Sequence, residues 1–489
     1  MLSIYQTKKH IRILEFGEVC IMAKKAVIIG GGIAGIYVMR NLLEKREAVK
    51  KDLEITLIKR ENEGWVSCCG LPYALRGWYA IDKVVINDPK FFQEKGVDFK
   101  TGTEVVQINT EDCLLKLKTG ETLKYDYLVI ATGRKPALPD IIERSTFENI
   151  FTLSNMEDAC KMQVAFSSGD VNNALVRGRG IIALQAAVAA AANNIKTTVL
   201  AGPPSLLPGS LDPDMGDMLK EWLQKKGIEF ILEKKPITAL KSDRGRVKSV
   251  VIGHGGEIEV PADMVIVSMG MRPNNKLAVE AGIETGDTGG IVTDNSLHVK
   301  KEGSYLKDVY ALGDCIEVID GITLRPKLNQ LASTCVVQAN VISDNIISDF
   351  TGNPSLYSRY MPCMGPVVAE IGGLNFGSVG ITSEAAALAG IKTISGKATK
   401  LTKARYFPGA KPLTMKLIFD AFSKKLMGAQ MISEISVSDR VNEMAVAIYA
   451  GVTAEDLRDV ERCFDPSLSL LVDVTVDASQ DALGIRSVY

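Results

Sequence analysis

The sequence has only three histidines, no long apolar run and no excess of charge of one sign. Its 57 Lys and Arg residues nearly balance its 58 Asp and Glu residues, so the formal net charge is −1. A chain without excess positive charge has no field that draws it to nucleic acid or to an anionic membrane surface. A membrane-spanning helix needs about 18 consecutive apolar residues, and no segment provides them. We therefore expect neither nucleic acid nor a membrane as a partner.

Cysteine pairs of the Cys-x-x-Cys type are also missing. The nine cysteines are scattered and have no histidine partners, which argues against a zinc site and against the disulfide framework of a secreted protein. The first 21 residues mix basic and acidic side chains and lack the apolar core of a signal peptide. We expect a cytoplasmic protein without a metal site, in which residues 1–21 are an extension before a natural start at Met22.

The strongest motif is a glycine-rich turn between a buried strand at residues 26–29 and a helix. It reads Gly30-x-Gly32-x-x-Gly35. The glycines permit a tight turn and let the backbone approach a pyrophosphate at a helix N-terminus. With a second strand at Leu53–Ile58, the pattern predicts a dinucleotide-binding βαβ unit.

The end of that second strand departs from the usual pattern. A carboxylate commonly stands there and holds the ribose of the dinucleotide. Here the position is occupied by Lys59, followed by Arg60 and Glu61. We count Lys59 and Arg60 among the candidate cofactor-binding residues, although the usual ribose contact is missing.

A second βαβ unit covers residues 174–200, with an alanine-rich helix in its middle. Its turn reads Gly178-x-Gly180-x-x-Ala183 and keeps two glycines and a small third residue. A nicotinamide dinucleotide therefore fits this turn.

The surroundings of the second turn are unusual. Arg177 ends the strand, Arg179 lies inside the turn, and Gln185 replaces an expected glutamate. The next strand runs into residues 199–203 without an acidic side chain for a ribose hydroxyl. The two arginines either favour the phosphate of NADP or obstruct the site.

Further strands and helices follow from hydrophobic patterning. Residues 308–314 are a strand that ends on the carboxylate of Asp314, which also suits a helix N-cap. From about Leu356 the pattern changes to that of a mixed or antiparallel sheet followed by helices. The other expected elements are strands at 125–133, 263–269, 367–371, 413–419 and 426–430, a hairpin of 247–252 and 257–260 around His254, and helices at 438–450 and 454–460.

Four segments in order resemble the FAD-dependent pyridine nucleotide–disulfide oxidoreductases. They read GGGIAG, YDYLVIATGRKP, ALGDC and KARYFPGAKPL. Cys69-Gly-Leu-Pro-Tyr is similar to the single-cysteine branch of that family, which includes coenzyme A disulfide reductases, persulfide reductases and NADH oxidases. The resemblance implies an α/β fold with two Rossmann-like domains, for FAD and NAD(P)H, and a C-terminal α+β domain that forms a homodimer.

The resemblance also implies domain limits and cofactor residues. The limits are 1–21 for the extension, 22–146 and 272–350 for the two parts of the FAD domain, 147–271 for the NAD(P)H domain and 351–489 for the dimerisation domain. FAD is expected at Gly30, Gly32, Gly35, Thr132, Gly133, Arg134 and Asp314. NAD(P)H is expected at Gly178, Arg179, Gly180 and Ala183, with Gly270 in the loop beside the nicotinamide.

Cys69 is the expected catalytic residue. No cysteine follows it until Cys113, so the paired-cysteine disulfide of glutathione reductases is absent. Cys69 must act alone, pair with Cys68, or bond an external sulfur, and neighbouring cysteines rarely bridge because the geometry is strained. The chain also lacks a histidine in the first glycine turn, where related peroxidases carry one and this chain has Ile33.

Candidate substrate residues are Cys68, Tyr73 and Arg76, which lie next to the expected nucleophile, together with Tyr406 and Cys463. The last two fall in segments that, in the family, approach the partner subunit's site. We predict reduction of a disulfide, persulfide or polysulfide of a small thiol such as coenzyme A. The alternatives are an NADH oxidase that reduces O₂ and an electron-transfer subunit with a donor other than a nicotinamide.

Overall fold

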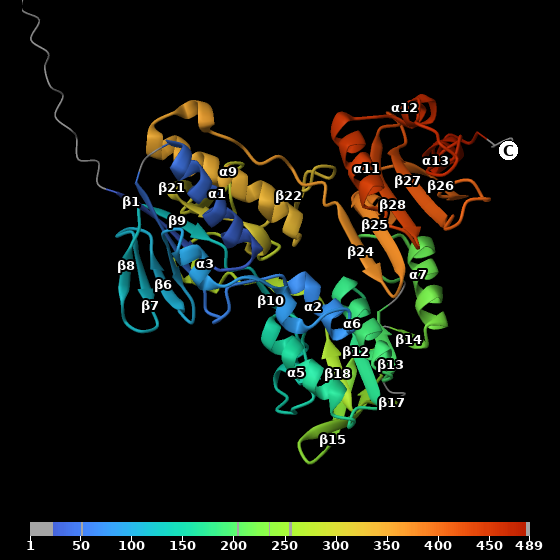
Figure 1. Ribbon diagram of the computed structural model, residues 1–489, viewed down its shortest axis with the longest axis horizontal. Coiled ribbons are helices and arrows are strands. Elements are labelled where there is room, and N and C mark those ends of the chain that lie inside the picture. Colours follow the sequence, from blue (N-terminus) through green and yellow to red (C-terminus); the bar gives the residue numbers. More distant parts are fainter. Residues whose placement is uncertain (1–22, 50–51, 203–204, 234, 254–256, 486–489) are drawn as a thin grey trace, which may run out of the picture.

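The protein consists of three units, each built around its own sheet (Figure 1). The computed structural model describes residues 23–49, 52–202, 205–233, 235–253 and 257–485. The expected extension and the turn at His254 lie outside these residues. Among the described residues no helix has the length and apolar character of a bilayer span. No three His, Cys, Asp or Glu side chains of this part of the chain are grouped to hold a metal ion.

The first unit is a six-stranded sheet assembled from two distant parts of the chain. Its elements are β1 (Lys24–Ile29), α1 (Ile33–Val49), β2 (Leu53–Ile58), β5 (Val97–Lys100), β9 (Tyr127–Ile130), β20 (His298–Lys301), β21 (Ser304–Ala311) and α9 (Ala332–Thr351). The order is β20-β21-β9-β1-β2-β5, parallel except for the β20–β21 pair. Helices α1 and α9 lie side by side (Figure 1) and are joined by a 2.7 Å hydrogen bond from Asn41 to Asn340.

The glycine turn after β1 has the tight geometry that its sequence predicts. Gly30 has φ +115°, and a Cβ there would lie 2.0 Å from the carbonyl oxygen of Ala131, at the end of β9. A Cβ at Gly35 would lie 2.0 Å from the carbonyl oxygen of Gly30. Both contacts are far inside van der Waals distance, so only glycine allows β1, β9 and the start of α1 to meet here.

The second unit is a parallel sheet of five strands. Its elements are β11 (Ile150–Phe151), α5 (Met156–Ser167), β12 (Asn173–Arg177), α6 (Ile181–Ala192), β13 (Lys196–Ala201), α7 (Pro213–Lys225), β14 (Ile228–Leu232) and β18 (Met264–Val267). The order is β11-β18-β12-β13-β14. Attached to it is an antiparallel sheet of β15 (Ile237–Asp243), β16 (Arg246–Ile252) and β17 (Ile258–Pro261), in which β16 and β17 pair as the sequence predicts.

The third unit is an antiparallel sheet with helices on it, in red and orange in Figure 1. Its elements are β24 (Val367–Ile371), β25 (Leu374–Gly380), α10 (Ser383–Leu388), β26 (Thr393–Leu401), β27 (Pro412–Asp420), β28 (Leu426–Ser433), α11 (Ser438–Ala450), α12 (Ala454–Asp459) and α13 (Val474–Ala482). The order is β24-β25-β28-β27-β26. The predicted fold class, two dinucleotide-type α/β sheets followed by an α+β sheet, is confirmed, whereas the exact domain limits stay predictions.

Shorter elements complete the fold. A small antiparallel sheet in the first unit consists of β6 (Val105–Asn109), β7 (Leu114–Leu117) and β8 (Thr122–Lys124). The others are β3 (Trp65–Val66), α2 (Leu71–Leu75), β4 (Val85–Asn87), α3 (Pro89–Gln93), β10 (Arg134–Pro136), α4 (Asp140–Glu143), β19 (Met271–Pro273), α8 (Lys276–Glu280), β22 (Val318–Ile319) and β23 (Pro326–Lys327).

The second and third units are joined by buried polar contacts. Gln430 of β28 exchanges two hydrogen bonds with Asp212, through the backbone nitrogen at 2.7 Å and the carboxylate at 3.0 Å. Lys416 of β27 lies 3.0 Å from Asp212 and 2.8 Å from Asp214. Because buried polar groups stabilise only when they are paired, this set of contacts fixes one docking of the two sheets.

Candidate functional site

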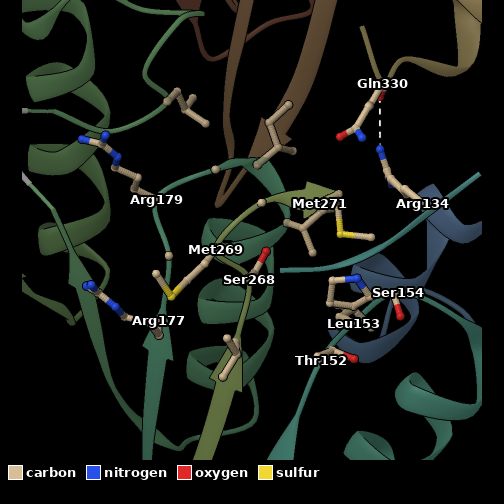
Figure 2. A pocket seen from close by; sticks show the side chains of 18 of the residues that line it. Arg134, Thr152, Leu153, Ser154, Arg177, Arg179, Ser268, Met269, Met271 and Gln330 are labelled. Atoms are coloured by element: carbon tan, nitrogen blue, oxygen red, sulfur yellow. Dashed lines mark hydrogen bonds between the residues drawn. The ribbon is translucent and has the colours of Figure 1, made fainter. Parts of the chain in front are cut away.

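A cavity of about 900 Å³ lies at the carboxyl ends of four parallel strands of the second sheet. The residues that follow β11, β12, β13 and β18 form one wall, and Cys68, Cys69, Arg134 and Gln330 of the first unit also line it. Figure 2 shows Arg134 and Gln330 on one side of Met271, and Arg177 with Arg179 on the other. In open α/β sheets a crevice at the carboxyl ends of the strands is the usual place for a ligand.

The two neighbouring cysteines lie on this cavity and are exposed. They begin a 3₁₀ turn, Cys68–Gly70, which runs directly into α2 with Pro72 in its first turn. A Cβ on Gly70 would lie 2.9 Å from the hydroxyl of Tyr79 and 3.0 Å from Cγ1 of Val84, so a side chain there would require these two side chains to shift. Although Cys68 is exposed, the surrounding walls remove part of its hydration. This desolvation, with a smaller contribution from Cys69, raises the pKa of the Cys68 thiol.

Tyr73 and Arg76 of α2 face away from the cavity and anchor the helix to the other two units. The hydroxyl of Tyr73 accepts a 2.8 Å hydrogen bond from Nε2 of Gln185 on α6. Arg76 binds both carboxylate oxygens of Glu370 on β24 at 2.8 and 3.0 Å. The space between these residues measures only about 10 Å³, which holds no substrate. Their expected role in substrate binding stays a prediction, and the contacts they make are structural.

The first glycine turn and its neighbours fit a flavin dinucleotide. A Cβ on Gly32 or Gly133 would meet nothing within 4 Å, so both backbones are open to a ligand. Asp314 follows β21 near the same strand ends, and desolvation raises the pKa of its carboxyl while Arg134, 3.2 Å away, opposes the rise. Nε2 of Gln330 is buried without a hydrogen-bond partner among the described residues. A carbonyl group of a ligand would accept a hydrogen bond from Nε2 of Gln330, and a hydroxyl group would donate one to the carboxyl of Asp314.

Thr132 is engaged with the protein itself. Its hydroxyl donates a 2.7 Å hydrogen bond to the carbonyl of Asn274. Its role toward the flavin therefore rests on the backbone of the Thr132–Gly133 turn, and it stays a prediction.

Lys59 and Arg60 make contacts within their own loop. Lys59 is buried, and its Nζ donates a 2.7 Å hydrogen bond to the carbonyl of Gly64. Desolvation lowers the pKa of its amine. Arg60 is exposed and lies 3.3 Å from Glu61. Neither contact replaces the missing ribose carboxylate, and the cofactor roles of both residues stay predictions.

The second glycine turn has the close approach that a dinucleotide turn requires. Gly178 has φ +150°, and a Cβ there would lie 2.1 Å from the carbonyl of Ser268 and 2.9 Å from the Cβ of Ala183. Because Gly178 has no Cβ, the methyl group of Ala183 fits beside it, so alanine is tolerated at the third small position of the turn. A Cβ on Gly180 would meet nothing within 4 Å, so the turn is open toward the cavity.

The two arginines of the second turn point to the end of β13. Nη1 of Arg177 donates to the carbonyl of Leu200 at 3.2 Å, and Nη1 of Arg179 donates to the carbonyl of Gly202 at 3.1 Å. Burial lowers the pKa of Arg177, and the charge of Arg179 lowers it further. Both arginines therefore line the cavity at the carboxyl ends of β12 and β13.

The loop of Gly270 also lines the cavity. Gly270 has φ +96°, and its carbonyl accepts a 3.0 Å hydrogen bond from the backbone of Ala137. Sequence reasoning missed its neighbours Met269 and Met271, although their place beside Gly270 is a usable signal. It also missed Gln330, which carries no motif and reaches the cavity only through tertiary folding.

Tyr406 and Cys463 do not line the cavity of this chain. Tyr406 is 73% exposed between β26 and β27, and Cys463 is exposed after α12. His298, the only described histidine, is paired with Asp294 at 3.2 Å and packs on Tyr310, outside the cavity. The roles of Tyr406 and Cys463 in a partner's site stay predictions.

Curated relatives match nearly the whole chain. A NADH oxidase of Methanocaldococcus jannaschii is 31% identical over 94% of this chain and 98% of its own length. An NAD(P)H coenzyme A polysulfide/persulfide reductase of Pyrococcus horikoshii is 28% identical over 92% of this chain and 97% of its own. Among solved structures, an NAD-dependent persulfide reductase from A. fulgidus is 27% identical with a TM-score of 0.86, over 94% of this chain and 83% of that one.

Two family models cover most of the described residues. The model of the pyridine nucleotide-disulphide oxidoreductases matches residues 24–338, and the model of their dimerisation domain matches residues 371–471. Enzymes of this family use FAD and NAD(P)H. The glycine turns, the cavity and these matches agree: the chain belongs to the pyridine nucleotide-disulphide oxidoreductase family and is an oxidoreductase of its NADH oxidase and coenzyme A persulfide reductase group.

Proposed function

We propose that this enzyme uses NAD(P)H to reduce a disulfide, persulfide or polysulfide of a small thiol, such as coenzyme A, through Cys69. The observation that carries the proposal is that Cys69 and the second glycine turn line one cavity. A nicotinamide donor held at Gly178 and Gly180 therefore shares a space with the thiol. The relatives named as persulfide reductases support the same substrate class.

The reaction needs one nucleophilic sulfur and one pair of electrons. The thiolate of Cys69 attacks R–S–S–R′, forms a mixed disulfide Cys69–S–S–R and releases R′–S⁻. FAD, when bound, supplies the two electrons of NAD(P)H, which cleave the mixed disulfide to the Cys69 thiolate and R–S⁻, leaving NAD(P)⁺ and one proton. A persulfide, in which R′ is hydrogen, releases hydrosulfide in the first step.

The residues around the thiols have separate tasks in this proposal. Gly30, Gly32, Gly133 and Asp314 would hold the flavin. The charge of Arg134 opposes the rise of the Cys68 pKa without reversing it, and the same cation would attract an anionic sulfur substrate. Cys68 keeps its proton because its pKa is raised, so it is suited to donate a hydrogen bond to a sulfur anion.

Replacement of Cys69 tests the proposal. Cys69→Ser should keep its flavin but lose thiol or sulfide release when NAD(P)H and a coenzyme A disulfide or persulfide are supplied without oxygen. Cys160→Ser, in α5 and outside the cavity, is the matched control and should keep full turnover. Unchanged turnover in Cys69→Ser would sink the proposal.

A second candidate is an NADH oxidase that reduces O₂, because the relative with 31% identity carries that name. Oxygen consumption that matches NADH loss and is insensitive to added disulfide would favour it. Stimulation of NAD(P)H oxidation by a small disulfide without oxygen favours the reductase instead.

We also propose that the enzyme is a homodimer. Its dimerisation domain presents large apolar side chains, and Leu468, Leu471, Tyr449 and Val446 are 79, 76, 69 and 68% exposed. Four large apolar side chains exposed within one domain support an interface with another protein. Sedimentation velocity tests it, since a monomer at micromolar concentration would contradict the proposal.

A further inference from the structure

Two arginines stand where the ribose of a nicotinamide dinucleotide meets the second sheet, and none of the described residues at this strand end is acidic. Arg177 ends β12 and Arg179 follows it in the glycine turn, and the side chains of both reach the carbonyls of Leu200 and Gly202 at the end of β13. β12 and β13 are neighbours, with Arg177 in register with Leu200. Figure 2 shows both guanidinium groups on the same side of the cavity, away from Arg134.

The charge of the cavity favours an anionic ligand beside these two arginines. Its lining holds three arginines and, within the described part of the chain, no Asp or Glu side chain. The guanidinium groups of Arg177 and Arg179 repel each other strongly enough to lower the pKa of Arg177 below the level set by burial. An anion between them would remove that repulsion and bind through charge-assisted hydrogen bonds.

In a dinucleotide-binding fold, side chains at the end of the second strand contact the 2′ position of the ribose. An acidic side chain there binds a 2′-hydroxyl and selects NAD, whereas a nearby arginine accommodates a 2′-phosphate. In this chain the last residue of β13 is Ala201 and the next is Gly202. The acid is replaced by small residues, and two cations occupy its surroundings.

We propose that Arg177 and Arg179 bind the 2′-phosphate of NADPH and make NADPH, rather than NADH, the electron donor of this enzyme. The inference rests on the proposed function, because it assigns the donor of that reaction. It gives the two unusual residues of the second turn one common task.

The first experiment measures the donor and the phosphate contact separately. The flavin of the holoenzyme is titrated without oxygen with NADPH and with NADH, and adenosine 2′,5′-bisphosphate and 5′-AMP are compared by calorimetry. Wild type should bind the bisphosphate more tightly, and Arg177→Ala or Arg179→Ala should weaken that binding roughly tenfold or more, as the loss of a charge-assisted hydrogen bond predicts. Added salt should weaken NADPH binding more than NADH binding.

A matched control and a reversal sharpen the test. Lys196→Ala removes one charge from the opposite end of β13, where Lys196 pairs with Glu229, and should leave both donors unchanged. Gly202→Asp restores an acid at the strand end. The site tolerates it, because a Cβ on Gly202 meets nothing within 4 Å. This variant should lose NADPH and gain NADH, and it reports on specificity even if an arginine variant fails to fold.

The outcomes separate this inference from the proposed function. Equal or better flavin reduction by NADH, or bisphosphate binding no tighter than that of 5′-AMP, overturns the NADPH inference and leaves disulfide reduction intact. Flavin reduction by NADPH without any consumption of disulfide or persulfide overturns the proposed function and leaves the inference intact. If neither nucleotide reduces the flavin, the inference is wrong and an external electron donor takes its place; reoxidation of dithionite-reduced enzyme by a persulfide then tests Cys69 separately.

Discussion

Nε2 of Gln185 donates a 2.8 Å hydrogen bond to the hydroxyl of Tyr73, and the same nitrogen donates to the carbonyl of Glu370 at 3.1 Å. One amide thus joins α6, α2 and β24, which belong to the three units of the molecule. Because α2 follows the cysteines directly, this joint sets where Cys68 and Cys69 stand relative to the second sheet.

Gln185→Leu should therefore disturb both stability and catalysis. The buried hydroxyl and carbonyl would lose a donor, which costs about 1–3 kcal/mol. Movement of α2 should also lower the turnover number roughly tenfold without loss of flavin, because a displacement of a reacting group by about 1 Å slows the reaction strongly. Urea unfolding and steady-state kinetics check the two effects, and Gln224→Leu, at an exposed position of α7, is the control. Lower stability with unchanged turnover would mean that the joint does not position the thiols.

The two open glycines should separate the two cofactors. A Cβ at Gly32 or Gly180 meets no protein atom within 4 Å, so either alanine variant should fold. The methyl group would instead occupy space that a pyrophosphate needs. Gly32→Ala should lower the flavin content of the purified protein, while Gly180→Ala should keep the flavin and raise the KM for the nicotinamide donor. Absorbance spectra and kinetics distinguish them, and identical behaviour of the two variants would contradict the assignment.

The raised pKa of Cys68 predicts slow alkylation near neutral pH. The thiolate is the reactive form, and an ordinary cysteine has a pKa of about 8.5. In a Cys69→Ser variant desolvation remains the main cause, so at about pH 8 Cys68 should react with iodoacetamide several-fold more slowly than free cysteine. The rate should rise as pH increases beyond the ordinary pKa. Peptide mass spectrometry measures it, and alkylation as fast as that of free cysteine would refute the shift.

The ion pair of Asp473 and Arg440 predicts a pH-dependent contribution to stability. Desolvation opposes ionisation of Asp473, but the hydrogen bonds and charge of Arg440, at 2.9 and 2.6 Å, outweigh it and lower the pKa of the carboxyl. A carboxyl with a lowered pKa stabilises the fold above its unfolded pKa of about 3.9, and the contribution is lost as pH falls through the folded pKa.

Asp473→Asn isolates this ion pair. Asparagine keeps one acceptor oxygen and can still cap α13, where Oδ1 of Asp473 accepts a 2.9 Å hydrogen bond from the backbone of Thr475. The variant loses the charge and the second hydrogen bond that the carboxylate accepts from Arg440. The variant should be less stable than wild type by roughly 1–3 kcal/mol near neutral pH, and the difference should shrink below about pH 4. Urea midpoints across pH test this, with Asp243→Asn, at the exposed last residue of β15, as the control. A constant difference at all pH values would contradict it.

Local rules predict the parts of this protein that local geometry determines. The Gly30 turn can be read from the sequence because its positive φ and its close approach to β9 admit only glycine. Strand β24 is predictable because the β-branched residues Val367, Val368 and Ile371 stand directly before a turn signal, Gly372-Gly373. The Arg177 and Arg179 substitutions are visible for the same reason, since they interrupt a motif with fixed spacing.

Elements that depend on tertiary contacts escape such rules. Helix α9 was not predicted, because its buried face carries Gln338, Ser343 and Asn345 and so breaks the apolar period. Tyr73 and Arg76 lie near Cys69 in sequence, which is why they are predicted at the substrate, and that role stays a prediction. The contacts that hold their side chains are not visible in the sequence, because their partners Gln185 and Glu370 are 112 and 294 residues away along the chain.

The split first sheet constrains how this chain is made. β9 pairs with β1 on one side, but its other neighbour is β21, which is synthesised only after the entire second unit. At ribosomal speeds of about 5–20 residues per second, the free edge of β9 waits on the order of ten seconds or longer. An unpaired strand edge is a template for aggregation. The second unit can fold during that interval, because its five strands are contiguous between Ile150 and Val267, so the second glycine turn forms before the six-stranded sheet of the first unit can close.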